Sequence, residues 1–547
     1  MRNFWYVKHY ETVIQELARR GHHVVIASEH QYRESSSAPP WNAAAAALAA
    51  ATPNVRLEWM PAPAGRFRYM VKMTVRSAGD YTRFLLPRYR DTPRLGTKAR
   101  RLTPWVVRRL AAMRPFTSDR GRATLVGWLR RLEEALTIDG SIAAFLDRER
   151  PDVVLITPLV TLASEQLDLL RSARARGIHA LVAVGSWDHL SSKALIRVLP
   201  DRLMVWNATQ KEEARVLHDV PAERVAVTGA QSFDHWFTWT PSRSREEFLA
   251  HVGLPADRPF VLYTCSALLF GSPLEAPFVV RWARALRAHP GLEAMSVLVR
   301  PHPKRSKEWI DTDRADLDVL RLWPAVGVAP MTASTRADYF ESLYYASAVV
   351  GLNTTAFIEA GIVGRPVLTV ILPEYRDNQD GTLHFRYLTD VGGGLLDVAH
   401  SMEEHLDQLL RAVGGAAKPR VPFLEAFVRP RGLSVPATTV FVDEVEASVR
   451  APVLPRPARS PGAALAKACL WLCVVPSLYL FVWIPPRVRH EFLQGREDLQ
   501  NWRKERNKAA ARIARVEKHR RVKQLAVEAH RRRKRDGGGQ STPSTSR

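Results

Sequence analysis

Residues 348–370 read AVVGLNTTAFIEAGIVGRPVLTV, and this stretch decides the fold. It contains two short apolar runs, 348–350 and 366–370, which are typical of buried strands. A helical stretch lies between them. A strand, a helix and a second strand in such close succession indicate two parallel strands of one sheet. The stretch therefore predicts a parallel sheet covered by helices.

The same alternation of strands and helices extends over most of the chain. Residues 10–20 have helical spacing, and Gly21 follows where a helix would end. Further apolar runs lie at 23–27, 151–156, 180–184, 202–206 and 224–228 and, after a polar stretch, at 260–264 and 296–300. We predict an α/β fold with two Rossmann-like, doubly wound domains, 1–237 and 259–450, joined by a linker at 238–258. Ligand sites in such folds lie beyond the carboxyl ends of the strands.

Length and composition limit the class of protein. The chain has 547 residues, which is several times the size of one domain. Hydrophobic residues make up 46% and charged residues 24%, so a disordered, collagen-like or disulfide-scaffold protein is excluded. The three Cys are too few and too far apart for a disulfide framework or a structural zinc site, which fits a reducing compartment. Lys8, Glu11 and Glu16 interrupt any apolar run at the start, so we expect no signal peptide.

The net charge of +24 is concentrated in two zones. Residues 66–131 hold 18 basic and three acidic residues, and residues 487–547 hold 19 basic and seven acidic ones. The rest of the chain is close to neutral. Such zones favour an anionic partner, namely a phospholipid membrane, a nucleic acid or a phosphorylated substrate. The alternative is a set of helices with a solvated basic face.

The turn after the strand at 348–350 is a candidate anion site. If Thr354 and Thr355 open a helix behind Asn353, their hydroxyls and the free N–H groups of the first turn can hold a diphosphate. Glu359, one turn further on, can accept hydrogen bonds from ribose hydroxyls. The structural alternative is a Thr that caps the helix and a solvated Glu.

The loops after two other strands of the second domain carry further candidates. In the stretch 300–303, which reads RPHP, the prolines hold the chain extended and fix the directions of Arg300 and His302. Cations there can neutralise phosphate charge, and we predict a catalytic role for His302, although a lone His is often structural. Ser266 lies in a loop of small residues after 260–264 that can approach a phosphate closely.

The first domain carries the candidate proton acceptor. Asp188 and His189 follow the strand at 180–184, and Lys193 lies one turn on. Asp188 or His189 can remove a proton from an acceptor hydroxyl, and the ordinary pKa of His is the better suited to this task. Alternatively, Asp188 caps a helix that begins near Leu190. The Asp-Thr-Asp stretch at 311–313 has the context of a helix start, so we predict no metal site and no cofactor.

Taken together, these motifs resemble the GT-B glycosyltransferases. The resembling features are the Thr-rich turn, the Glu before Ala-Gly, and the Gly-Arg-Pro that follows. Within that superfamily the chain is most similar to non-hydrolysing UDP-N-acetylglucosamine 2-epimerases and CDP-glycerol glycerophosphotransferases. The stretch RPHP at 300–303 is similar to the glycerophosphotransferases, and VTGAQSFD at 227–234 to the Val-Thr-Gly-Asn-Pro segment of the epimerases. The resemblance covers about residues 10–450.

The resemblance implies roles for several residues. Thr354 and Thr355 would face the donor diphosphate, Glu359 the ribose, and His302 with Arg300 the phosphate or leaving group. It also implies a reaction without a metal and an acceptor bound by the first domain.

Two departures from the family pattern matter. The Ser-Gly-Gly turn of the epimerases is replaced by residues 353–355, NTT, and the catalytic acids of epimerases have no counterpart that we can place. No apolar strand precedes Arg2, so we expect the first strand of the first domain to be missing from this sequence. Either the true start codon lies upstream, which we favour, or the sheet is incomplete.

The C-terminal region predicts attachment to a membrane. A stiff Pro-rich linker at 451–461 leads to a hydrophobic segment, 462–486, of which residues 468–486 form 19 uncharged positions. Pro476 divides this run into two pieces that are each too short to cross, so a hairpin in the membrane keeps both flanks on the cytoplasmic side. The alternative is a helix buried against the enzyme. Residues 487–547 should form a basic helix and a disordered end, and no fold for recognising nucleic acid accompanies them.

The sequence therefore predicts a bacterial GT-B transferase on the cytoplasmic face of the membrane, either peripheral or monotopic. It would move a sugar or a glycerol phosphate from a nucleotide-diphosphate donor to a surface glycan, a polysaccharide or a lipid-linked acceptor. Two alternatives stay open. One is a sugar-nucleotide epimerase of the same fold, and the other is a non-catalytic GT-B scaffold tethered to a membrane or nucleic acid by its tail.

Overall fold

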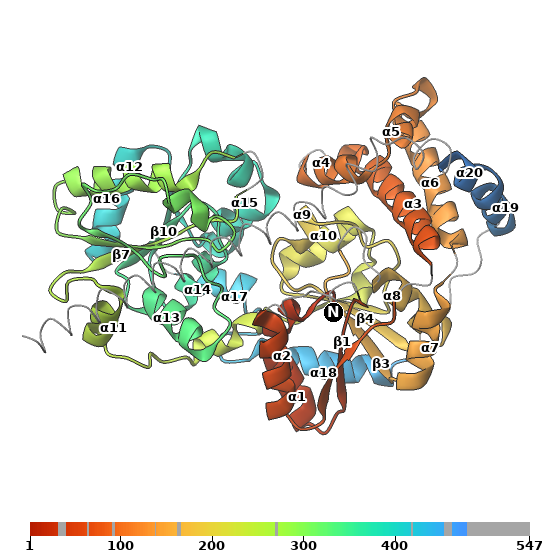
Figure 1. Ribbon diagram of the computed structural model, residues 1–547, viewed down its shortest axis with the longest axis horizontal. Coiled ribbons are helices and arrows are strands. Elements are labelled where there is room, and N and C mark those ends of the chain that lie inside the picture. Colours follow the sequence, from red (N-terminus) through yellow and green to blue (C-terminus); the bar gives the residue numbers. More distant parts are fainter. Residues whose placement is uncertain are drawn as a thin grey trace, which may run out of the picture. The chain divides into compact units, whose positions relative to one another are not determined.

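The computed structural model describes residues 1–30, 40–62, 65–89, 93–136, 138–160, 166–268, 272–416, 420–452 and 462–478 (Figure 1). Internal contacts divide the chain into two compact units, Met1–Cys469 and Leu470–Arg547. Both predicted Rossmann-like domains belong to the first unit. The predicted basic tail, 487–547, lies outside the described residues, as do most of the Pro-rich linker and the end of the hydrophobic segment.

The first domain contains two parallel sheets in the described part of the chain. One pairs β1 (Val24–Ser28) with β2 (Val55–Trp59), and the other has the order β3-β4-β5-β6. The four strands of the second sheet are β3 (Val153–Ile156), β4 (His179–Ala183), β5 (Arg202–Val205) and β6 (Val225–Val227). Every predicted strand of this domain is therefore confirmed, whereas β2 was not predicted.

Helices cover these sheets, as expected for parallel strands that are buried on both faces. In chain order they are η1 (Phe4–His9), α1 (Glu11–Arg19), α2 (Pro40–Ala51), α7 (Gly140–Glu149), α8 (Gln166–Ala175), α9 (His189–Ser192), α10 (Ala208–His218), η5 (Ala222–Arg224) and η6 (Gln231–Phe237). The residues at the start of the chain lie between the two sheets. The Met1 ammonium donates to the Ala27 carbonyl (2.6 Å) beside the end of β1, and the Arg2 N–H donates to the Thr157 carbonyl (3.3 Å) after β3.

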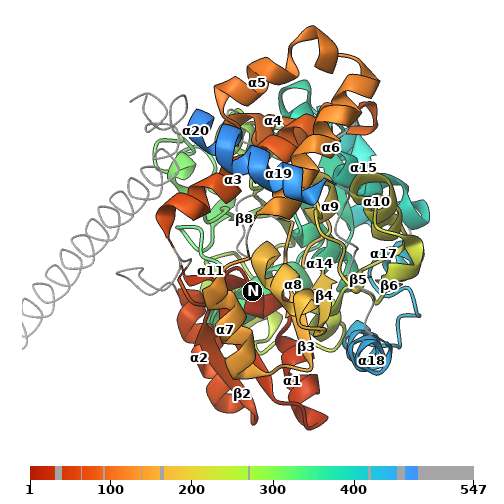
Figure 2. The ribbon, with the colours of Figure 1, turned by 90° about the vertical axis from the view of Figure 1, so that its right-hand side faces the viewer.

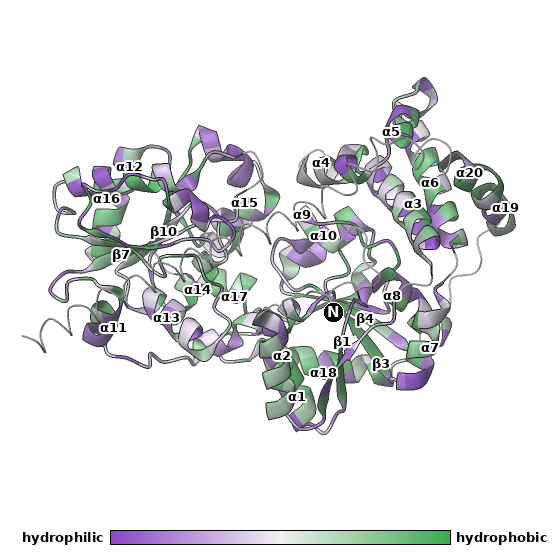
Figure 3. Cartoon of the chain, in the orientation of Figure 1, coloured by the Kyte–Doolittle hydropathy of each residue, from purple (hydrophilic) through white to green (hydrophobic). Residues whose placement is uncertain are grey.

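The second domain has one parallel sheet with the order β12-β11-β10-β7-β8-β9. Its strands are β7 (Phe260–Thr264), β8 (Ser296–Arg300), β9 (Leu320–Leu322), β10 (Ala348–Gly351), β11 (Val367–Val370) and β12 (Asp397–Ala399). In Figure 3 the strands around β7 and β10 are green, as expected for strands without a solvent-facing side. The helices are α11 (Arg245–Val252), α12 (Glu275–Ala288), η7 (Ser306–Trp309), α13 (Ala333–Tyr344), α14 (Ala356–Ile362), η8 (Pro373–Asn378), α15 (Leu383–Asp390), η9 (Val391–Gly393), α16 (Met402–Val413) and α17 (Val421–Phe427). The expected fold class is thus confirmed.

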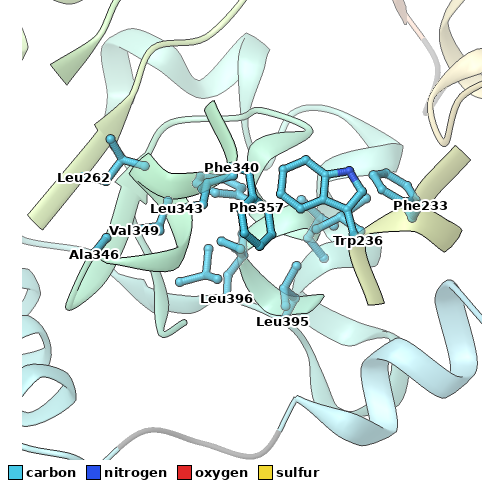
Figure 4. Packing of buried hydrophobic residues seen from close by; sticks show 14 of the residues in the cluster. Phe233, Trp236, Leu262, Phe340, Leu343, Ala346, Val349, Phe357, Leu395 and Leu396 are labelled. Atoms are coloured by element: carbon cyan, nitrogen blue, oxygen red, sulfur yellow. The ribbon is translucent and has the colours of Figure 1, made fainter. Parts of the chain in front are cut away.

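The two domains share part of their hydrophobic core. Phe233 and Trp236 of η6 pack in one cluster with Phe340 of α13 and Phe357 of α14 (Figure 4). The predicted linker at 238–258 also joins this cluster, because it contains α11, whose Phe248 and Leu249 are fully buried. A capping box between Ser244 and Glu247 starts this helix.

The chain crosses back to the first domain after the second sheet is complete. Helix α18 (Ala437–Arg450) lies within the stretch assigned to the second domain, yet its buried Phe441 and Val442 pack in one cluster with Leu181 of β4. The Asp234 carboxylate accepts hydrogen bonds from the first two N–H groups of this helix, at 3.1 and 2.6 Å. Gly229 has φ +87, and a Cβ there would lie 2.7 Å from the Ala437 side chain. The segment 227–234, singled out in the sequence, therefore fastens this returning helix.

A helical insert separates β2 from the rest of the first domain. It contains α3 (Arg66–Phe84), η3 (Pro87–Tyr89), α4 (Pro93–Leu102), α5 (Trp105–Ala111), η4 (Arg114–Phe116) and α6 (Asp119–Ala135). Its basic residues are partly turned inward, because Lys72 and Arg76 form buried ion pairs with Asp168 of α8 at 3.0 and 2.7 Å. Helix α19 (Ala463–Cys469) packs on α6, as Figures 1 and 2 both show.

The second unit is described only over Leu470–Leu478, where the π-helix η10 (Leu470–Val474) continues into α20 (Val475–Leu478). Among the described residues, no helix combines the length and the apolar composition that crossing a bilayer requires. The predicted hairpin over 462–486 lies partly outside the described residues and stays a prediction.

Candidate active site

A cavity of about 960 Å³ lies between the two Rossmann-like domains. Its walls come largely from the residues that follow strands, as parallel sheets predict. The lining residues include Gly185, Trp187 and Asp188 after β4, Cys265 after β7, Pro301 and His302 after β8, and Asn353, Thr354 and Thr355 after β10. Eight of the ten predicted site residues line the cavity, namely Asp188, Lys193, Arg300, His302, Asn353, Thr354, Thr355 and Glu359.

The turn after β10 faces this cavity. The N–H of Asn353 donates to the Ser266 hydroxyl (3.1 Å), and the Thr355 hydroxyl accepts a hydrogen bond from the Trp187 indole (3.3 Å) across the cavity. In the part of the chain that the structure describes, the N–H groups of Thr354 and Thr355 donate to no protein acceptor. Two adjacent N–H donors directly before the first residue of α14 are thus available to an oxyanion of a ligand.

Ser266 lies behind the turn rather than in the cavity. Its side chain is fully buried, and its N–H donates to the Glu275 carboxylate at 2.7 Å. Burial raises the pKa of Glu275 to about 8, so this carboxyl is largely protonated at neutral pH. Ser266 contacts both Glu275 and Asn353, and it therefore positions the turn.

The buried Arg300 and the partly buried Tyr339 and Glu359 form a polar group in the second domain. The Arg300 guanidinium donates to the Ser342 hydroxyl (2.9 Å) and lies over the Tyr339 ring, whose hydroxyl donates to the Glu359 carboxylate. Burial lowers the pKa of Arg300 to about 10, which leaves it charged at neutral pH. Burial also raises the pKa of Glu359 to about 7. The group therefore offers one fixed cation and one acceptor whose charge depends on pH.

His302 is a neutral hydrogen-bond donor in this arrangement. Its Nδ1 accepts a hydrogen bond from the Lys304 N–H at 3.2 Å, so in the neutral ring the proton lies on Nε2. Burial lowers the pKa of His302 to about 4, and the neighbouring Lys304 and Arg305 act in the same direction. At neutral pH the ring can therefore donate one hydrogen bond to a ligand oxygen from Nε2.

The first-domain wall contains an ion pair. The Asp188 carboxylate contacts Lys193 Nζ at 2.8 Å and accepts hydrogen bonds from Ser186 (2.7 Å) and Ser192 (2.9 Å). Burial would raise the pKa of Asp188, but Lys193 and two histidines hold it well below its usual range. His189 is buried and is not among the residues that line the cavity. Of the two predicted proton acceptors, Asp188 is the one that a ligand in the cavity can reach.

The chain is similar to solved sugar-nucleotide epimerases and to a teichoic acid polymerase. UDP-GlcNAc 2-epimerase from Neisseria meningitidis bound to UDP-GlcNAc matches with 11% identity, 78% of this chain, 99% of that chain and a TM-score of 0.40. UDP-N-acetylglucosamine 2-epimerase from Rickettsia bellii matches with 14% identity, 60% and 80% coverage and a TM-score of 0.37. The wall teichoic acid polymerase TagF, in a structure with CDPG, matches with 14% identity, 48% and 59% coverage and a TM-score of 0.29.

No family model and no curated protein sequence matches the chain.

Several cavity residues were not predicted from the sequence. Lys8 of η1 and Arg336 of α13 line the wall, and Arg336 pairs with Glu11 of α1 at 2.9 Å, which links the two domains. Thr97 and Arg101 of α4 bring the helical insert to the cavity. These residues come from helices and turns rather than from strand ends, so no strand pattern marks them. Among the described residues, no three His, Cys, Asp or Glu side chains gather closely enough to hold a metal ion.

Binding of an anionic donor should depend on pH through Lys8 and Glu359. Burial lowers the pKa of Lys8 to about 8, and burial raises the pKa of Glu359 to about 7. The Lys8 cation is lost as the pH rises through 8, and the Glu359 carboxylate is lost as the pH falls through 7. We expect the tightest donor binding between these values, with affinity falling up to about tenfold per pH unit on either side. Titration calorimetry from pH 5.5 to 9.5 measures the donor affinity at each pH.

Two variants assign the two limbs of that profile. Glu359→Gln should flatten the acid limb and leave the alkaline one, and Lys8→Met should do the reverse. A profile that both variants leave unchanged would show that other groups control the pH dependence.

Proposed function

We propose that the protein is a metal-independent transferase that moves a sugar or a polyol phosphate from a nucleotide-diphosphate donor to a glycan or lipid-linked acceptor. The observation that carries the proposal is the cavity between the two domains. It combines the Arg300 cation, the His302 donor and the free N–H groups of Thr354 and Thr355 on the second-domain wall. Charged and N–H donors that converge in this way suit a diphosphate.

Within this proposal the second domain holds the donor. The diphosphate would lie between the turn 353–355 and the Arg300 and His302 side chains, and the Glu359 carboxylate would accept hydrogen bonds from the ribose. Stabilisation of the departing phosphate by fixed donors needs no metal ion.

The first domain would receive the acceptor. Asp188 faces the cavity from the opposite wall, and its contact with Lys193 keeps it ionised. It can orient an acceptor hydroxyl and take its proton as the bond to the donor forms. Because its pKa is low, it is a weak base, and we assign the larger share of the catalysis to His302 and Arg300.

A thermal-shift assay with UDP-, CDP-, GDP- and dTDP-linked donors tests the proposal. A ligand at 100 times its dissociation constant stabilises the folded state by about 2.7 kcal/mol, which corresponds to a rise in Tm of roughly 5–10 °C for a domain of this size. We expect one class of donor to produce this rise, and the matching nucleoside without phosphates to produce none. If no donor shifts the Tm, the proposal fails.

Turnover separates a transferase from an epimerase. An epimerase converts UDP-N-acetylglucosamine in the absence of any acceptor. The transferase releases the free nucleotide at a substantial rate only after an acceptor has been added. Rapid conversion without an acceptor would contradict the transfer reaction while leaving the nucleotide site intact.

A further inference from the structure

Large apolar side chains are exposed on a short segment of the helical insert. Leu102, Trp105, Leu110 and Met113 are 40%, 47%, 39% and 52% exposed. All four lie within twelve consecutive residues at the end of α4, in α5 and just after it. A soluble surface seldom gathers so many large apolar side chains in one place without a partner.

The same segment is strongly basic. Arg108, Arg109 and Arg114 lie among these apolar residues, and no acidic residue occurs between Asp91 and Asp119. Lys72 and Arg76 do not contribute, because they are buried and paired with Asp168. Arg109 and Arg114 are exposed, and Arg108 is partly exposed. We call the residues Leu102, Trp105, Arg108, Arg109, Leu110, Met113 and Arg114 the α4–α5 surface.

The α4–α5 surface continues directly into the wall of the cavity. Arg101, which precedes Leu102, lines the cavity together with Thr97. The insert is also the part of the first unit on which α19 packs, and the chain runs from α19 into the apolar run at 470–478. One helical insert thus lines the cavity and contacts α19.

We propose that the α4–α5 surface docks on an anionic phospholipid bilayer. Arginines attract lipid phosphates, a Trp is favoured at the level of the headgroups, and Leu and Met gain from transfer into the acyl region. The aliphatic side chains favour lipid over nucleic acid, because a single-stranded nucleic acid is held by stacking on aromatic rings. The inference rests on the proposed function, because the role of docking would be to bring a lipid-linked acceptor to the cavity.

A fluorescent probe on this surface tests the docking. In the full chain with Cys469→Ser and Cys473→Ser, the single remaining Cys265 is buried and should not react. Met113→Cys in this background then takes an environment-sensitive label such as NBD. The matched control is Ile310→Cys, which places the label at a 71% exposed apolar position in the second domain. Vesicles of phosphatidylcholine alone are compared with vesicles that contain 30% phosphatidylglycerol.

We expect the label at position 113 to brighten at least twofold with the anionic vesicles and to stay unchanged with the neutral ones. The label at position 310 should stay unchanged with both. The gain should decrease in 1 M salt, where the screening length is about 3 Å. An unchanged label at position 113 while the protein floats with the vesicles would overturn the proposal, because the basic tail would then account for binding. Absence of flotation, or brightening with RNA and not with vesicles, would also overturn it.

A second variant tests the apolar contribution. Trp105→Ser, Leu110→Ser and Met113→Ser together should lower the fraction bound to anionic vesicles about three- to tenfold. The control pair Leu274→Ser and Ile310→Ser, at exposed positions of the second domain, should leave it unchanged. The donor-induced rise in Tm should be the same in all these variants. Absence of docking by the unaltered protein with an intact donor response therefore contradicts only this inference, and absence of the donor response in the unaltered protein contradicts only the proposed function.

Discussion

Replacing His302 by alanine is expected to lower the turnover number by about 10²- to 10⁴-fold, the usual contribution of a positioned proton donor. The reason is that the neutral ring presents Nε2–H to the cavity while its Nδ1 is occupied by the Lys304 N–H. The dissociation constant of the donor should change much less, because the hydrogen bond strengthens as charge develops on the leaving phosphate. Rates with saturating donor and acceptor measure the effect.

Two further variants make this result specific. His302→Gln keeps an N–H donor near the position of Nε2 and should recover part of the lost rate. His400 is an exposed histidine of the same domain and does not line the cavity between the domains. His400→Ala should therefore leave the rate unchanged. A rate within threefold of the unaltered enzyme for His302→Ala would exclude a catalytic role.

Replacing Arg300 by alanine is expected to weaken donor binding by about 10- to 150-fold. A hydrogen bond to a charged group contributes roughly 1.5–3 kcal/mol, and the Arg300 cation is held in place by the Ser342 hydroxyl and the Tyr339 ring. The free energy of unfolding should also fall by roughly 1–3 kcal/mol, because Ser342 loses a buried partner. Titration calorimetry and denaturant unfolding measure the two effects separately.

The conservative variant and a remote one complete this test. Arg300→Lys keeps the charge but loses the planar guanidinium that lies over Tyr339, so it should recover only part of the affinity. Arg284 lies on α12 and forms an exposed ion pair with Asp316. Arg284→Ala removes this ion pair and should change neither the donor affinity nor the free energy of unfolding appreciably. Equal donor affinity in Arg300→Ala and the unaltered protein would remove Arg300 from the donor site.

The central strands of the four-stranded and the six-stranded sheet could be predicted from the sequence, because they are buried on both faces and are therefore almost wholly apolar. The strands that were missed are β2, β9 and β12, which are short or carry charged residues. The sequence of β2 is VRLEW, that of β9 is LRL and that of β12 is DVA. Each lies at the edge of its sheet, where one side of the strand reaches solvent and the apolar pattern is weaker.

The second-domain wall of the site was predictable for a related reason. Residues that follow parallel strands of one sheet lie at the same edge of it, and β8 and β10 both pair with β7, so His302 and the turn 353–355 lie at that edge. Ser266 follows the same rule along the chain, but its side chain turned inward to hold Asn353. The Ser266 N–H donates to the carboxylate of Glu275, which lies nine residues away in α12, and no local sequence pattern indicates such a contact.

Contacts between the domains could not be predicted at all. Lys8 and Glu359 are separated by most of the chain, and both line the cavity only because the two domains pack together. The pairing of Glu11 with Arg336 has the same origin. A single sequence contains the residue types for these contacts but not the distance between them.

Helix α18 sets a rule for building chimeras of this protein. Because its buried Phe441 and Val442 complete the core beside β4, the peptide chain passes between the two halves twice, once near residue 238 and again near residue 436. A protein fragment that ended after the first passage would lack α18, would expose the apolar residues that α18 covers, and should be insoluble. Exchange of the second domain with that of another protein therefore requires two recombination points, with α18 retained from the recipient.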